Sequence, residues 1–216
     1  MKRLIPVSGL ADEKWEVRVI DDPDQKNAFV MPGGKVFVFS GILPVCGDDD
    51  GLAAVLGHEI SHTVAHHVGE KISKSFILGF AALALAFFID TSAQTTNLLL
   101  TFLLELPNSR KQESEADYIG LQMMAQACYN PQAAVGLWQR MTKDERGAPP
   151  QFLSTHPASK NRVEVIQKWI PEAMDRQAQS DCSATSAYAD QFSQAFKPKS
   201  YQDAPVKRRG DDDYFF

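Results

Sequence analysis

The chain lacks any apolar stretch of the roughly 20 residues that a helix needs to cross a bilayer. Its longest apolar run, Phe76–Ile89, has fourteen residues, and the next, Leu98–Leu106, contains the polar Thr101 and Glu105. Runs of this length are typical of a buried helix or of a segment that lies in the membrane interface. For residues 76–106 we therefore expect an apolar hairpin that makes a shallow membrane contact, with a place in the protein core as the alternative.

The chain also has few cysteines, no visible repeat and no large excess of charge of one sign. The 216 residues include three cysteines, and none has the short spacing of cysteine zinc ligands. The net charge of −5 is spread over both signs, which argues against a nucleic-acid partner. Because 44% of the residues are hydrophobic and no linker is visible, we expect one domain over residues 1–195. Residues 196–216 mix charges without apolar periodicity, which predicts a disordered charged tail.

The segment His58-Glu59-Ile60-Ser61-His62 has the most specific chemical pattern, H-E-x-x-H. Four residues advance an α-helix by about 6 Å, a little more than one turn, so both imidazoles leave the same face. Their nitrogens can meet one zinc ion at about 2.0–2.1 Å. Glu59 is then placed to take a proton from a water on that ion. The pattern predicts His58 and His62 as metal ligands and Glu59 as the general base.

A catalytic zinc keeps three protein ligands and one open position, so one more ligand is required. The best candidate is Glu113, because Glu113 and Asp117 are four residues apart and share one face of a helix. One carboxylate can bind the metal while the other accepts a hydrogen bond from a ligand histidine. Glu115 points elsewhere by this spacing and is expected to be a solvated surface charge. The alternative is that these acidic residues only favour a helix N-terminus.

Short strands are expected before the zinc helix. Trp15–Ile20 and residues 27–43 contain alternating apolar positions, and Pro32-Gly33-Gly34 indicates a turn. The sequence therefore predicts an α+β fold that is mainly α-helical, with a small antiparallel sheet preceding the H-E-x-x-H helix. His66 and His67 are expected on that same helix as structural or surface side chains, because His66 lies about 12 Å along the axis from His58.

Several longer motifs resemble a known family. Beside H-E-x-x-H they are residues 27–43, Glu113–Leu121, Phe152–Ser159 and Ser180-Asp181-Cys182. Over roughly residues 13–195 the chain resembles the membrane-associated zinc peptidases of the gluzincin type that include CaaX prenyl proteases and HtpX-like enzymes. Within this family it is especially similar to the mitochondrial inner-membrane metalloendopeptidases whose activity overlaps with that of the m-AAA protease.

The resemblance implies a zincin-like fold and roles that spacing alone does not single out. It brings His156 near the site as a catalytic donor to the tetrahedral intermediate, whereas Pro157 by itself indicates a helix start. Arg162 could orient His156 or pair with Asp117 or another carboxylate. The resemblance further assigns substrate contact to two residues of the strand region, for which an ordinary core hairpin is the alternative: Asn27 and Ala28.

For the whole molecule the resemblance implies a zinc-dependent endopeptidase with one Zn²⁺ per chain. Its substrates would be membrane-anchored proteins in the quality control and stress response of the mitochondrial inner membrane. The catalytic domain would face the intermembrane space and could form a homo-oligomer. Because that compartment permits oxidation, Cys128 and Cys182 are expected to form a disulfide, with Cys46 as a buried free thiol.

Two other functions remain open alternatives. One is a bacterial-envelope quality-control metallopeptidase, which would share the same motifs. The other is a non-catalytic metal-binding chaperone or scaffold, against which Glu59 argues because a module that only holds metal needs no base. Met1–Pro6 is too short to contain the apolar core of a signal peptide. We therefore expect the chain to be a catalytic portion without the import and anchoring segments of the family.

Overall fold

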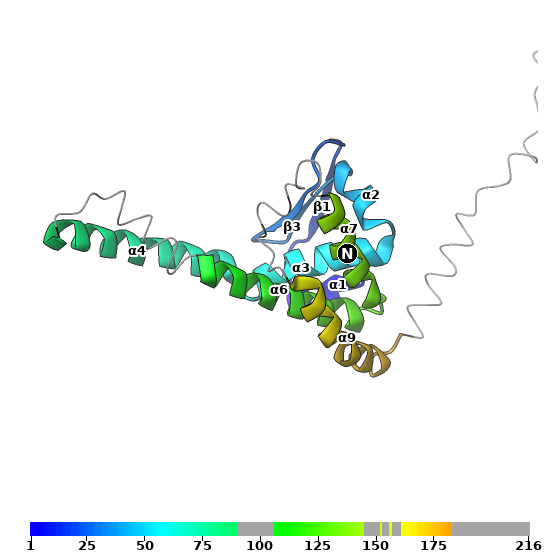
Figure 1. The fold of residues 1–216 in the computed structure, drawn as a ribbon. Coiled ribbons are helices and arrows are strands. Elements are labelled where there is room, and N and C mark those ends of the chain that lie inside the picture. Colours follow the sequence, from blue (N-terminus) through cyan, green and yellow to red (C-terminus); the bar gives the residue numbers. More distant parts are fainter. Residues whose placement is uncertain (90–105, 145–151, 153–155, 157–160, 183–216) are drawn as a thin grey trace, which may run out of the picture. The chain divides into compact units, whose positions relative to one another are not determined.

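The computed structural model describes residues 1–89, 106–144, 152, 156 and 161–182. The chain divides into two compact units, Met1–Ser180 and Asp181–Phe216, and the elements all belong to the first. In chain order (Figure 1) they are α1 (Leu4–Val7), β1 (Glu16–Ile20), β2 (Ala28–Met31), β3 (Lys35–Phe39), the 3-10 helix η1 (Ser40–Ile42), α2 (Leu43–Cys46), α3 (Asp49–Val64), α4 (His67–Ile89), α6 (Leu106–Gln126), α7 (Gln132–Asp144) and α9 (Arg162–Ala178). The mainly α-helical α+β class is confirmed. The expected second half of the apolar hairpin, the helix start at Pro157 and the tail 196–216 lie outside the described residues.

The sheet has three strands in the order β1-β3-β2 and is mixed, which corrects the predicted antiparallel sheet. β2 and β3 pair antiparallel around Gly33 and Gly34, whose φ angles of 82° and 75° suit residues without a Cβ. β1 instead pairs parallel with β3, because residues 21–27 carry the chain across the end of β3 before β2 begins. Gly41 permits this crossing, since a Cβ there would lie 2.5 Å from the carbonyl oxygen of Pro23.

Helix α3 carries the H-E-x-x-H segment and begins with acidic residues. The carboxylate of Asp48 accepts a hydrogen bond from the backbone N–H of Gly51 at 2.8 Å, which caps the helix. Asp49 and Asp50 lie in the first turn, where negative charge is favourable. Every residue from Ala53 to Ser61 is buried, so the packing of neighbouring elements fixes the helix on all sides.

Helices α3 and α6 approach each other so closely that their backbones touch. A Cβ on Gly120 of α6 would lie 2.8 Å from the backbone nitrogen of His58 and 2.9 Å from the carbonyl carbon of Gly57. Only a residue without a side chain fits at such a distance. This contact between Gly57 and Gly120 sets the spacing between the helix of His58 and the helix of Glu113.

The core surrounds α3 and draws on nearly every other element. Its largest fully buried side chains include Leu4, Ile42, Ile60, Met124, Leu137, Met141, Phe152 and Ile166. Arg3 ties the N-terminal segment to the end of α6, because it donates to the carbonyls of Ala127 and Cys128. Cys128 and Cys182 are disulfide-bonded, in agreement with the expectation, and Cys46 is a buried free thiol.

The chain turns between α3 and α4, so the prediction that His66 and His67 continue the zinc helix is wrong. His66 is exposed and has a φ of 55°, in the left-handed region that non-glycine residues rarely adopt. His67 opens α4 and is only 4% exposed. The sharp change of direction at His66 brings His67 back towards the end of α3.

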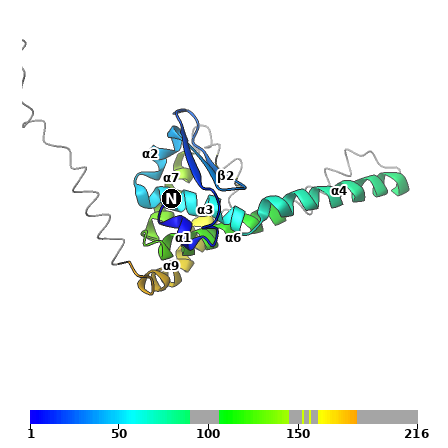
Figure 2. The ribbon, with the colours of Figure 1, turned by 180° about the vertical axis from the view of Figure 1, so that it is seen from behind.

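Helix α4 extends away from the rest of the unit in both views (Figures 1 and 2). Near its start it lies against α6, where the Gln112 amide donates a hydrogen bond to Glu70 at 2.6 Å. Large apolar side chains are exposed along it, namely Val68, Ile72, Phe76, Ile77, Phe80 and Leu83. None of the helices in the described part of the chain is both long enough and apolar enough to cross a membrane.

Candidate metal centre

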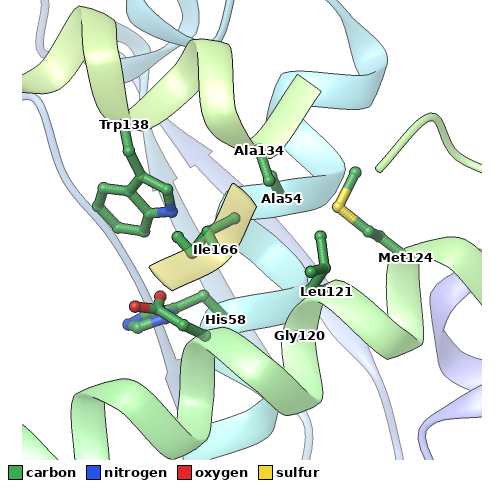
Figure 3. A pocket seen from close by; sticks show the side chains of 9 residues that line it. Ala54, His58, Gly120, Leu121, Met124, Ala134, Trp138 and Ile166 are labelled. Carbon is green, nitrogen blue, oxygen red and sulfur yellow. The ribbon is translucent and has the colours of Figure 1, made fainter. Parts of the chain in front are cut away.

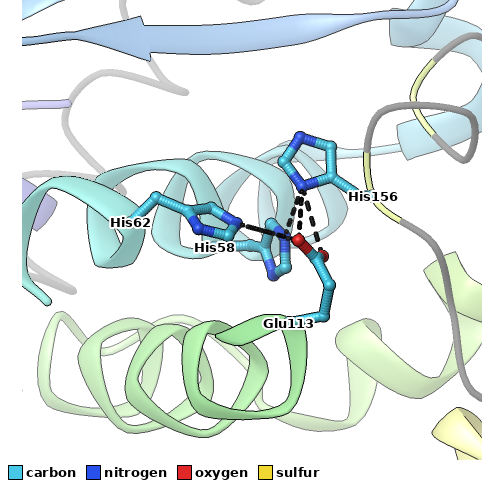
Figure 4. A group of neighbouring side chains, drawn as sticks. All are labelled: His58, His62, Glu113 and His156. Atoms are coloured by element: carbon cyan, nitrogen blue, oxygen red, sulfur yellow. Dashed lines mark hydrogen bonds and ion pairs between the residues drawn. The ribbon is translucent and has the colours of Figure 1, made fainter. Parts of the chain in front are cut away.

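Four side chains converge at one point (Figure 4): His58 and His62 from α3, Glu113 from α6, and His156. One ligand atom from each lies within 4.8 Å of the others. The Nε2 atom of His58 is 3.2 Å from His62 Nε2 and 3.3 Å from Glu113 Oε2. Ligand atoms around a tetrahedral zinc are about 3.3 Å apart when each bond is about 2.0–2.1 Å. The two imidazole nitrogens and the carboxylate therefore have the spacing and the chemistry of a zinc site.

Glu59 lies beside these residues and is 4% exposed. Burial raises the pKa of its carboxyl group, an effect larger than the opposing charge of His156. Its Oε1 atom is buried and accepts no hydrogen bond from the described residues; His156 Nε2 lies 3.3 Å away. A raised pKa and a free oxygen are the properties expected of a general base that receives a proton from water.

The outer nitrogen of His58 is held by a buried carboxylate. His58 Nδ1 is 3.0 Å from Asp117 Oδ1, and Asp117 accepts a further hydrogen bond from Arg162 at 2.5 Å. The Arg162 guanidinium in turn lies over the ring of Trp138, 3.4 Å from its centroid. Burial acts to lower the pKa of His58, but the hydrogen bonds to Asp117 and Glu113 outweigh it and raise the pKa to about 9.

The other two candidate ligands have the protonation states that metal binding requires. Burial and the nearby His58 lower the pKa of His62 to about 2, so its imidazole is neutral. Burial acts to raise the pKa of Glu113, but hydrogen bonds from His156 and His58 outweigh it and hold the pKa well below the ordinary carboxyl range. A neutral imidazole and an ionised carboxylate are both ready to donate a lone pair to a cation.

His156 bridges the two carboxylates of the site. Its Nδ1 atom lies 3.2 Å from both oxygens of Glu113, and its Nε2 atom faces Glu59. The imidazole stacks on the ring of Phe152, with centroids 4.6 Å apart. The family resemblance predicted that His156 lies near the site. Among the described residues, Arg162 contacts Asp117 and Glu113 rather than His156.

The two residues expected to face substrate are not part of this cluster. The side chain of Ala28 is fully buried at the start of β2. Asn27 precedes it, and its amide oxygen accepts a hydrogen bond from the Ala28 N–H at 2.9 Å. The neighbouring Lys26 carbonyl accepts a hydrogen bond from the backbone N–H of Phe152 at 3.3 Å, which ties this strand start to Phe152.

Three neighbours of the site were missed in the sequence. Trp138 and Phe152 flank His58, with ring centroids 5.7 Å and 5.8 Å from it. His67 lies against His62. Figure 3 shows the apolar packing behind His58, where Trp138 and Ile166 line a cavity of about 10 Å³ that holds at most one water. No local pattern marks these residues, because each reaches the site from a different element.

A helix with H-E-x-x-H, packed on a second helix that supplies a carboxylate and next to a small sheet, defines a zincin-like metallopeptidase. The family can be stated from comparison with known proteins. Residues 1–170 match the model of peptidase family M48, and the chain belongs to that family.

Individual relatives are similar over most of this chain. It is 52% identical over 184 residues to mitochondrial metalloendopeptidase OMA1 of Schizosaccharomyces pombe, and 47% identical over 187 residues to that of Saccharomyces cerevisiae. These matches cover 84% and 83% of the chain but 54% of each relative, so the chain spans about half their length. The beta-barrel assembly-enhancing protease of Escherichia coli is 27% identical over 158 residues, which are 65% of this chain and 31% of that protein.

Proposed function

We propose that the protein is a zinc-dependent endopeptidase. The observation that carries this proposal is the convergence of His58, His62 and Glu113 at zinc-ligand spacing beside the buried carboxylate of Glu59. A metal-binding scaffold is the weaker alternative, since it would gain nothing from a buried carboxylate with a raised pKa and a free oxygen next to its ligands.

The residues suggest a division of labour. When bound, a zinc ion would polarise the scissile carbonyl and acidify a water molecule. Glu59 takes the proton of the attacking water and returns it to the leaving amine. His156, whose Nε2 faces Glu59, donates to the negative oxygen of the tetrahedral intermediate. Asp117, fixed by Arg162, holds the orientation of His58.

We also propose where and on what the enzyme acts. The two yeast relatives are mitochondrial metalloendopeptidases by name, which supports a mitochondrial location over a bacterial envelope, and the family resemblance points to the inner membrane. Disulfide-bonded Cys128 and Cys182 fit the oxidising intermembrane space. The exposed apolar side chains of α4 support a shallow membrane contact and hence membrane-anchored protein substrates in quality control and stress response.

We further propose that residues 1–195 form a peptidase domain, which the family match to residues 1–170 supports, and that residues 196–216 form a charged tail. Asn27 and Ala28 would meet substrate through their backbone, since the Ala28 side chain is buried. The net charge of −5 supports protein substrates rather than nucleic acid. Association into a homo-oligomer is proposed from the resemblance alone.

Metal removal tests the proposed activity. The purified protein should contain one zinc ion per chain by elemental analysis and should cleave casein. Incubation with 1,10-phenanthroline should abolish cleavage, and added zinc should restore it, while circular dichroism shows that the metal-free protein stays folded. Cleavage that persists in protein shown to be free of metal would contradict a zinc mechanism.

Zinc affinity should rise with pH. The pKa of His58 lies near 9 without metal, so its imidazole is protonated at pH 7 and must lose that proton to bind zinc. Affinity should therefore increase about tenfold per pH unit up to about pH 9 and then level off. Calorimetry in buffers of different ionisation enthalpy should find about one proton released per ion at pH 7. An affinity that is constant over this range would contradict the protonated state assigned to His58.

A further inference from the structure

We propose that His67 is a positioning residue, which together with Glu115 fixes the proton and the orientation of His62 as a metal ligand. The inference rests on the proposed metal site, because it concerns how one ligand of that site is held. The contact that carries it joins the Nδ1 atoms of His62 and His67, which are 2.8 Å apart. His67 is 4% exposed, so water does not compete freely for this contact.

The direction of each hydrogen bond follows from the position of the metal group. The Nε2 atom of His62 faces His58 and Glu113, and it must carry the lone pair that binds the ion. Its Nδ1 atom therefore carries the proton and donates it to His67 Nδ1. The remaining proton of His67 is on Nε2, which lies 3.4 Å from Glu115 Oε2. The hydrogen bonds thus run in one direction, from His62 through His67 to the carboxylate of Glu115.

Each of the two ligand histidines then has a carboxylate that accepts, directly or through another imidazole, the proton of its second ring nitrogen in a hydrogen bond. His58 donates directly to the carboxylate of Asp117, whereas His62 reaches the carboxylate of Glu115 through an intervening imidazole. Ligand histidines commonly donate their second N–H to such a partner, which fixes the tautomer and increases the basicity of the ligand nitrogen. Without His67, the Nδ1–H of His62 would have no acceptor among the described residues.

The backbone supports the same conclusion. A continuous helix would carry a residue five positions after His62 away from its ring. The helix instead ends at Val64, and His66 takes the left-handed conformation with a φ of 55°. Non-glycine residues adopt this conformation uncommonly, and mostly at the ends of helices, as here. Its effect is to turn His67 back onto His62.

The test compares three variants of the zinc-bound protein. His67→Leu removes the acceptor, and His67→Gln keeps an oxygen for His62 and an N–H for Glu115. His66→Asn is the matched control, because asparagine also tolerates the left-handed conformation and the His66 side chain is exposed and outside the contact. Zinc affinity is measured by competition with a chromophoric chelator, the ligand geometry by the visible spectrum of the Co²⁺ form, and folding by thermal unfolding in excess EDTA.

His67→Leu should bind zinc about 10–100-fold more weakly and should change the Co²⁺ spectrum. His67→Gln should recover most of the affinity, and His66→Asn should match the wild type. The inference is overturned if His67→Leu keeps the affinity and spectrum of His66→Asn while the wild type binds zinc normally. It is also overturned if Gln rescues nothing and both variants unfold earlier in EDTA, which would indicate a packing role. A wild type that binds no zinc would instead refute the proposed function and the inference with it.

Discussion

Glu59→Gln is expected to keep its zinc and to lose peptide cleavage by about 10²–10⁴-fold. Glutamine has nearly the same shape as glutamate but cannot accept a proton from water. The change should not unfold the protein. Burial raises the pKa of Glu59, so the ionised carboxylate costs stability above its unfolded pKa, and a neutral amide removes that cost. The melting temperature at pH 7 should therefore be at least that of the wild type.

The measurement is cleavage of a fluorescent casein, with zinc content determined on the same samples. Glu16→Gln is a suitable control, since Glu16 is exposed on β1 and pairs only with Lys35 and Arg18 among the described residues. Equal cleavage by Glu59→Gln and wild type would refute the assigned base. Loss of zinc from Glu59→Gln would show that this carboxylate holds the metal rather than the water.

Gly120→Ala should destabilise the protein and weaken the metal site together. The new Cβ would lie 2.8 Å from the backbone nitrogen of His58, and backbone atoms cannot move aside as a flexible side chain can. Overpacking of this kind costs about 1–3 kcal/mol. For a protein of this size, that corresponds to a loss of about 2–12 °C in melting temperature. Because α3 and α6 must separate, the distance between His58 and Glu113 should grow and zinc affinity should fall.

Gly69→Ala is the matched control for this variant. Gly69 also lies in a helix, but a Cβ there would meet no atom within 4 Å. Alanine favours the helical state by about 1 kcal/mol over glycine, so this control should melt at the same temperature or higher. Thermal unfolding with and without zinc distinguishes the two variants. A Gly120→Ala protein that melts with the wild type would contradict the close approach of α3 and α6.

The sequence was informative wherever the chemistry depends on spacing within one helix. The i, i+4 relations of His58 with His62 and of Glu113 with Asp117 predicted which side chains share a face, and the structure brings both pairs together. The carboxylate of Asp117 lies on the outer nitrogen of His58 rather than of His62, which no spacing could decide. That choice depends on how α6 packs on α3.

Features set by tertiary contacts could not be predicted. The break between α3 and α4 contains neither glycine nor proline at residues 65–68, so the usual signals of a helix end are missing. The contact of Trp138 with Arg162 joins α7 and α9, two separate helices. The contact of His67 with His62 depends on the turn between α3 and α4. The parallel pairing of β1 with β3 likewise depends on the crossing of residues 21–27. The turn between β2 and β3, in contrast, was predicted from Gly33 and Gly34.

The glycine contact between α3 and α6 has a consequence for biosynthesis. Gly57 and Gly120 are separated by the whole of α4 and the residues that follow it, so a ribosome exposes the two histidine ligands well before the carboxylate ligand. A nascent chain at that stage can offer zinc only two of its three protein ligands. Full affinity must wait until α6 has emerged and docked on α3, so metal capture follows the packing of these two helices.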